Sequence, residues 1–178
     1  MTSNLLTRRD VSVRLVSMLS VMGFVGKGRA MTEGVPFPEG DGISRTCECI
    51  HQEVAIKASR VRVYQALTDP KQFSKVTDVV MPGAATSISA DVGGAFSLFG
   101  GVITGRHIEM APGERLVQVW REKNWEPGVY SLVKFQLSDQ GTDTKLIFDQ
   151  TAIPQGHADH LAPGWKSHYW EPLQKYLG

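Results

Sequence analysis

Apolar residues recur along the chain at two different spacings, and each spacing predicts a different element. Near the C-terminus they stand at every fourth position, namely Leu161, Trp165, Tyr169, Leu173 and Leu177. This spacing places them on one face of a single amphipathic helix of roughly four turns. Residues 85–152 instead alternate apolar and polar positions between glycine-containing turns, which is typical of consecutive antiparallel strands. The two patterns predict an α+β fold in which a curved antiparallel sheet wraps around a long C-terminal helix.

The boundaries of the expected elements follow from the same alternation. Strands are expected near residues 51–56, 85–89, 94–99, 102–110, 115–121, 130–138 and 143–152. Two helices are expected between the first two strands. Ser59 is placed to cap a helix that contains Val61, and Asp69-Pro70 is placed to begin a shorter one that contains Phe73.

The first 30 residues differ in composition from the remainder. Residues 1–30 contain paired arginines, Arg8 and Arg9, before an apolar run that is too short to span a bilayer. This resembles a twin-arginine signal peptide. Residues 31–49 form an expected flexible linker, and residues 50–178 the expected folded domain. The protein is expected in the periplasm or outside the cell if the leader is used, and otherwise in the cytoplasm.

Charge argues against a nucleic-acid partner. Residues 31–178 contain 14 basic and 17 acidic groups, a net charge of −3. Proteins that bind nucleic acid carry a basic surface instead.

A series of motifs in the predicted domain resembles a known family. It comprises the run Phe96–Gly105, the run Leu116–Arg121, Trp125, Thr144-Lys145-Leu146 and the helix from Gly164 to Leu173. This series resembles the C-terminal domain of the Hsp90 co-chaperone Aha1, within the START-like helix-grip (SRPBCC) superfamily, over about residues 50–178. The resemblance implies a helix-grip fold with a cavity between helix and sheet. In such proteins the two helices after the first strand border the cavity mouth, so the resemblance implies that Phe73 is either a core residue or a residue at that mouth. Members of the superfamily include chaperone activators, lipid and hormone carriers and aromatic polyketide cyclases, so the contents of the cavity stay open.

The expected cavity wall is aromatic. Along residues 115–121, Trp120 and Gln118 share a face, and a polar amide on an apolar face requires a partner, either a neighbouring group or a ligand. The residues expected to contact a small hydrophobic molecule are Phe73, Phe96, Gln118, Trp120, Phe135, Trp165 and Tyr169.

Candidate acid-base chemistry is sparse. His107 and Glu109 share strand parity, so they could form a catalytic pair on one face of the sheet. Exposed alternation explains both residues equally well, and no catalytic residue is assigned. No phosphate-binding glycine loop or nucleophile elbow is present, so no cofactor is expected.

Two clusters contain potential metal ligands. Cys47, Cys49, His51 and Glu53 point to one side of an extended strand, and His157, Asp159 and His160 precede the C-terminal helix. Neither cluster has a second ligand set at the spacing usual for zinc. We therefore expect exposed polar positions in the first cluster, helix-start residues in the second, and no metal.

Three functions follow from these expectations. The favoured one is a noncatalytic protein that binds a small hydrophobic molecule. The second is an enzyme that uses the same cavity, as the resemblance to polyketide cyclases implies. The third is a chaperone partner, which the resemblance to Aha1 implies.

Export depends on the paired arginines if the leader is a twin-arginine signal. The double change Arg8→Lys and Arg9→Lys should keep the precursor in the cytoplasm, because recognition would require the guanidinium groups. Cell fractionation checks this. Mature protein outside the cytoplasm after the double change would contradict it.

Overall fold

The computed structural model describes residues 46–178. Residues 1–30, with the predicted signal, and nearly all of the predicted linker lie outside this part of the chain. No helix within residues 46–178 is long and apolar enough to cross a membrane.

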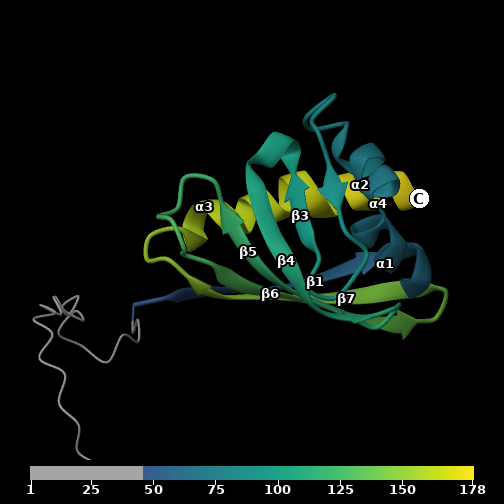
Figure 1. The fold of residues 1–178 in the computed structure, drawn as a ribbon. Coiled ribbons are helices and arrows are strands. Elements are labelled where there is room, and N and C mark those ends of the chain that lie inside the picture. Colours follow the sequence, from purple (N-terminus) through teal and green to yellow (C-terminus); the bar gives the residue numbers. More distant parts are fainter. Residues whose placement is uncertain (1–45) are drawn as a thin grey trace, which may run out of the picture. The chain divides into compact units, whose positions relative to one another are not determined.

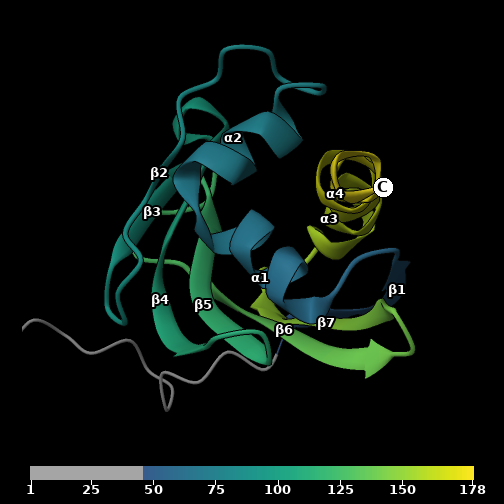
Figure 2. The same cartoon turned by 90° about the vertical axis from the view of Figure 1, so that its right-hand side faces the viewer.

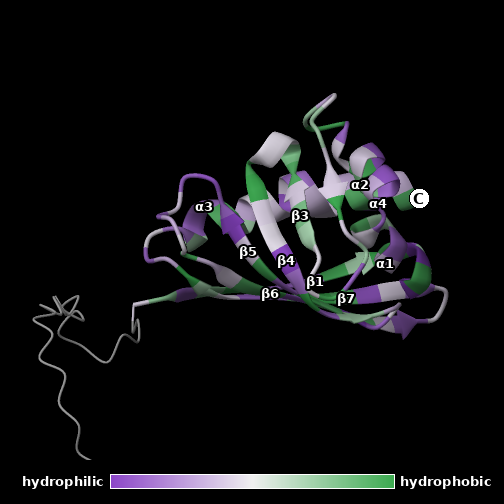
Figure 3. Ribbon diagram, in the orientation of Figure 1, coloured by the Kyte–Doolittle hydropathy of each residue, from purple (hydrophilic) through white to green (hydrophobic). Residues whose placement is uncertain are grey.

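Seven strands form one curved antiparallel sheet (Figure 1) in the order β1-β7-β6-β5-β4-β3-β2. The prediction of a strand meander is confirmed, and most strand boundaries fall within two residues of those expected. The strands are β1 (Glu48–Ile56), β2 (Ser87–Ile88), β3 (Ala95–Leu98), β4 (Ile103–Ala111), β5 (Arg115–Glu122), β6 (Ser131–Gln140) and β7 (Asp143–Ile153). Apolar and polar residues alternate along them (Figure 3), which leaves one face for the core.

The helices lie on the concave side of this sheet. Figure 2 looks along the C-terminal helix and shows the sheet bending around it and around the two N-terminal helices. The predicted helix-grip arrangement is therefore confirmed. The helices are α1 (Arg60–Thr68), α2 (Pro70–Thr77), α3 (Ala158–Trp165), the π-helical segment η2 (Lys166–Trp170) and α4 (Glu171–Leu177), and a short 3-10 turn, η1, covers Phe99–Gly101.

The C-terminal helix is continuous from Ala158 to Leu177, and all five residues of the predicted apolar stripe are buried. Its middle is a π-helical turn in which the Glu171 N–H donates to the Lys166 carbonyl. The turn directly precedes Pro172, which has no N–H to continue the α-helical ladder. The wider turn also buries Trp170, which the regular four-residue spacing did not predict.

The caps of the two short helices differ from each other. Asp69 caps α2 as predicted, because its carboxylate accepts a hydrogen bond from the Gln72 N–H at 2.8 Å. Ser59 occupies the N-cap position of α1, but its side chain makes no capping bond. Val61, expected on the apolar face of α1, is 54% exposed, because the inner face of that helix is built from Val63, Tyr64, Ala66 and Leu67.

The centre of the core is the Trp165 indole. Its ring lies 4.3 Å from Phe148, 4.2 Å from Tyr169 and 5.5 Å from Trp120, measured between ring centroids. Its Nε1–H donates a 2.7 Å hydrogen bond to the Gln150 side chain, which is itself fully buried. Trp165 therefore joins the helix to the sheet in two ways, through aromatic packing and through a buried hydrogen bond.

Trp165→Ala should lower the free energy of unfolding by about 3 to 5 kcal/mol, because it removes a large buried ring and leaves the Gln150 oxygen unpaired. The adjacent Lys166 is exposed, so Lys166→Ala should cost less than about 0.5 kcal/mol. Urea denaturation of both variants checks this. Equal midpoints would contradict the assignment of the buried face.

Candidate functional site

An apolar pocket of about 210 Å³ opens between the C-terminal helix and one end of strands β4 and β5. We call this cavity the apolar pocket. Its main apolar walls are Phe99, Ile103, Trp120, Leu161, Trp165 and Tyr169, and three polar residues, Glu122, His160 and His168, also border it. An apolar cavity with a few polar groups is the usual form of a small-molecule site.

The helix contributes to the pocket through residues one turn apart. Leu161, Gly164, Trp165 and His168 all line it, as the three- and four-residue spacings of one helical face require. Gly164 leaves part of this wall without a side chain. A Cβ atom added there would meet no heavy atom within 4 Å.

The opposite wall contains a strained residue. Phe99 has a φ of +52°, a left-handed conformation that costs a bulky side chain about 1 to 3 kcal/mol. Its ring packs edge-on against Tyr169, with centroids 5.4 Å apart, and against Phe73 at 5.9 Å. The packing of these rings holds the conformation in place at the pocket wall.

The structure divides the seven predicted ligand-contacting residues into three groups. Trp120, Trp165 and Tyr169 line the apolar pocket. Phe73 packs behind Phe99 and Tyr169, without lining the pocket. The other three, Phe96, Gln118 and Phe135, are buried in the core away from the pocket.

Two polar atoms in the pocket wall have no hydrogen-bond partner in the described structure. They are the Trp120 Nε1 and the Tyr169 hydroxyl. Burial raises the pKa of the Tyr169 hydroxyl, and the nearby Trp120 indole N–H opposes part of that rise. Both atoms are buried within the wall, so their side chains would have to turn before a bound molecule could reach them.

The expectation that His107 and Glu109 share a face is wrong. A β-bulge in β4 falls between them, so that His107 pairs with Gln118 while Glu109 pairs with the neighbouring Val117. The bulge at Ile108 adds one residue and reverses the alternation beyond it. His107 is therefore buried in the core, whereas Glu109 is on the outer face and binds Arg115, whose Nε lies 3.0 Å from its carboxylate.

His107 is the partner that the buried Gln118 amide requires. The Gln118 Nε2 lies 3.3 Å from the His107 Nδ1. Burial lowers the pKa of His107, and the Ser89 backbone opposes part of the shift. The imidazole is therefore held in its neutral form, behind the pocket wall.

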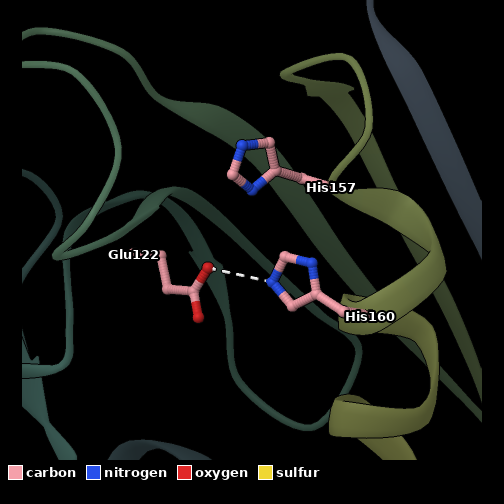
Figure 4. Close-up of side chains that lie close together, drawn as sticks. All are labelled: Glu122, His157 and His160. Carbon is pink, nitrogen blue, oxygen red and sulfur yellow. Dashed lines mark hydrogen bonds and ion pairs between the residues drawn. The ribbon is translucent and has the colours of Figure 1, made fainter.

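Three side chains that could bind a metal ion lie together at the rim of the apolar pocket. Figure 4 shows Glu122 at the end of β5 beside His157 and His160 at the start of α3. One ligand atom of each residue lies within 4.8 Å of the others, and this is the one such group of three within residues 46–178. The His160 Nε2 is 3.2 Å from the Glu122 carboxylate.

Sequence reasoning identified the two histidines but missed Glu122. The sheet carries Glu122 to the helix start, and no local spacing signals that approach. Asp159, the third residue of the expected cluster, is exposed in the first turn of α3 and stays outside the group.

The predicted cluster around the two cysteines lies on and just before the edge strand β1. Cys47, Cys49 and His51 are exposed, as expected for an edge strand. His51 contacts Asp149 of the neighbouring strand at 2.7 Å. That contact, together with Lys134, lowers the pKa of the Asp149 carboxyl.

The chain is similar to known proteins in both sequence and structure. The family profile described as "Activator of Hsp90 ATPase homolog 1-like protein" matches residues 57–178. An activator of 90 kDa heat shock protein ATPase homolog from Dictyostelium discoideum is 41% identical over 75 residues, which are 42% of this chain and 20% of that protein. A mouse homolog 2 of the same activator is 24% identical over 90 residues, 51% of this chain and 27% of that protein. The chain thus spans about a quarter or less of the length of these relatives.

Solved structures share the fold. An HSP90 activator from Plasmodium falciparum superposes with a TM-score of 0.67 at 23% identity, covering 73% of this chain and 96% of that one. The Aha1 dimer from Colwellia psychrerythraea gives a TM-score of 0.60 at 21% identity, with coverage of 73% and 96%. At these identities the likeness concerns the fold.

The neutral, buried His107 predicts a pH dependence of stability. As pH falls below about 6.5, the unfolded chain takes up a proton at this position before the folded protein does, because the folded pKa is lower. The free energy of unfolding should be fully maintained above that pH and should decrease, by up to about 1.4 kcal/mol per pH unit, until the folded pKa is reached.

The measurement is urea denaturation at pH 7.5 and at pH 5.5. His107→Gln should remove this part of the decrease, whereas His168→Gln, a change at an exposed histidine, should leave it in place. An unchanged decrease in the His107 variant would contradict the assignment.

Proposed function

The chain belongs to the activator of Hsp90 ATPase homolog 1-like family, and we propose that it uses the cavity of this fold to bind a small hydrophobic molecule without catalysis. The observation that carries the proposal is the apolar pocket, whose walls are mostly aromatic and aliphatic. Burial of apolar ligand surface stabilises a complex by about 25 cal/mol per Å². The pocket thus offers a driving force that requires no charged anchor.

The size and polarity of the pocket narrow the class of ligand. A volume of about 210 Å³ is small relative to the usual range for drug-sized ligands, roughly 300 to 1,000 Å³. This favours a compact molecule of one or two rings over a long lipid chain. Glu122, His160 and His168 border the pocket, so a ligand that carries one hydrogen-bonding oxygen, such as a phenol or a ketone, would find a polar partner at the rim.

The positions of the titratable groups support binding over catalysis. The candidate acid-base pair is divided between two faces of the sheet, because His107 is buried and Glu109 is on the outer face. His107 already contacts the Gln118 amide. A general acid or base must instead reach the reacting atoms of its substrate.

We also propose that the protein acts outside the cytoplasm, on the basis of Arg8, Arg9 and the apolar run that follows them. A carrier of hydrophobic molecules is suited to the periplasm, where such molecules cross between membranes through water.

The test is to fill the pocket without weakening the fold. Gly164→Leu places a side chain where an added Cβ has free space, and it replaces a glycine inside a helix, which favours folding by about 0.5 to 1 kcal/mol. Lys166→Leu is the matched control, because it adds the same side chain at an exposed position of the same helix. Binding of a fluorescent hydrophobic naphthol probe is measured by titration.

Gly164→Leu should weaken probe binding at least tenfold, about 1.4 kcal/mol, while its denaturation midpoint stays at or above that of the wild type. Lys166→Leu should bind as the wild type does. Equal affinity in all three proteins would place the binding site elsewhere. Conversion of a bound phenol or ketone by the wild type, detected by mass spectrometry, would favour the enzyme instead.

A second candidate is a chaperone partner, favoured by the 41% identity to the Dictyostelium activator of the heat shock protein ATPase. An exposed apolar segment after α2, Val79-Val80-Met81, would suit such a contact. The test is the ATPase rate of a purified Hsp90-class chaperone with and without this chain. Stimulation that is retained by Gly164→Leu and lost on Val79→Ser with Val80→Ser would support this role, and no stimulation would exclude it.

A further inference from the structure

We propose that Glu122, His157 and His160 form a binding site for one divalent transition-metal ion of the zinc class. The proposal concerns the rim of the apolar pocket and does not depend on what the pocket binds. It rests on the distances between the three side chains, on the chemistry of their donor atoms and on the contacts that hold them.

The distances are close to those of a metal centre. Zinc binds imidazole nitrogen and carboxylate oxygen at about 2.0 to 2.2 Å, so ligand atoms around a tetrahedral ion lie roughly 3.3 Å apart. The His160 Nε2 and the Glu122 carboxylate are already 3.2 Å apart. All three ligand atoms lie within 4.8 Å of one another, so a further small approach of the side chains would bring them to the spacing of a metal centre.

The donor set is one that zinc prefers. Two imidazoles and one carboxylate are a common three-ligand set for zinc, and they leave a fourth position open to water or to another ligand. Glu122 and His160 both line the apolar pocket. The open position would therefore be at the pocket rim, within reach of a polar group on a molecule bound there.

His157 is already in a form that can bind a metal. The Trp125 Nε1–H donates a hydrogen bond to the His157 Nδ1 at 3.2 Å, so this nitrogen carries a lone pair and no proton. Figure 4 shows a ring nitrogen of His157 directed toward Glu122 and His160. A metal bound at the Nδ1 would replace the Trp125 bond, which makes the Trp125 indole a reporter of occupancy.

The backbone that carries His157 is held from β1. The Glu48 carboxylate accepts hydrogen bonds from the Gly156 and Ala158 N–H groups, both at 2.8 Å. Such contacts behind the ligands position a site before the ion arrives.

The test uses the full chain without a histidine tag, stripped of metal with a chelator. Cobalt(II) is added as a probe that absorbs visible light when it is bound by nitrogen and oxygen ligands, and zinc is then added to displace it. The measurements are made in a Cys47→Ser, Cys49→Ser background, because exposed thiolates also bind zinc. Tryptophan fluorescence is recorded in parallel.

The parent should bind one equivalent, and its thermal midpoint should rise with zinc, because an ion bound only by the folded state stabilises it. Glu122→Gln, His157→Ala and His160→Ala should each weaken binding at least tenfold. His168→Ala is the matched control, since this histidine lines the pocket on the same helix but is outside the group, and it should bind as the parent does. Trp125→Phe removes the competing N–H donor and should bind at least as tightly.

Two results would overturn the proposal. One is the absence of stoichiometric binding at neutral pH, which would leave Glu122 and His160 as an ion pair only. The other is binding that survives Glu122→Gln and His160→Ala, which would assign the ion to other residues. Glu122→Gln preserves shape and size, so a loss of binding in this variant with an unchanged denaturation midpoint separates ligation from folding.

Discussion

A buried chain of hydrogen bonds determines how the C-terminal helix sits on the sheet. The Trp165 indole donates to Gln150, the Gln150 amide donates to the Ser131 hydroxyl at 2.8 Å, and Ser131 donates to the Trp120 carbonyl at 3.1 Å. Apolar packing alone is non-directional and tolerates many rotations of a helix. A buried polar group left unpaired costs about 1 to 3 kcal/mol, so this chain selects one rotation.

The apolar pocket depends on this rotation of the C-terminal helix. With Trp165 held by Gln150, the helix turns Leu161, Gly164 and His168 toward the ends of β4 and β5. Because Gly164 has no side chain, the aromatic layer is incomplete at this point. The strained Phe99 closes the opposite side and is held there by Tyr169. The pocket thus results from one missing side chain and one strained residue beside a tightly packed core.

The same helix rotation determines the polar rim. His157 lies just before α3 and His160 lies in its first turn. The end of β5 brings Glu122 to them. Glu48 holds this turn from the edge strand β1. An apolar cavity and a group of potential metal ligands therefore share a border, because Glu122 and His160 belong to both.

The sequence by itself determined the strands, the helices and the buried face of the C-terminal helix. These features depend on local periodicity, and a residue such as Leu173 is buried because of its spacing from Trp165. The sequence also identified Trp120, Trp165 and Tyr169, because large aromatic residues on a predicted inner face must line either a core or a cavity.

The tertiary structure decided those features that the local spacing of apolar residues does not encode. One bulged residue, Ile108, placed His107 and Glu109 on opposite faces, because the side-chain alternation of a strand reverses at each inserted residue. The π-helical turn before Pro172 buried Trp170 beside Tyr169. The approach of Glu122 to His157 and His160 arises where the sheet bends around the helix, and contacts between residues so distant in the chain leave no signal in local spacing.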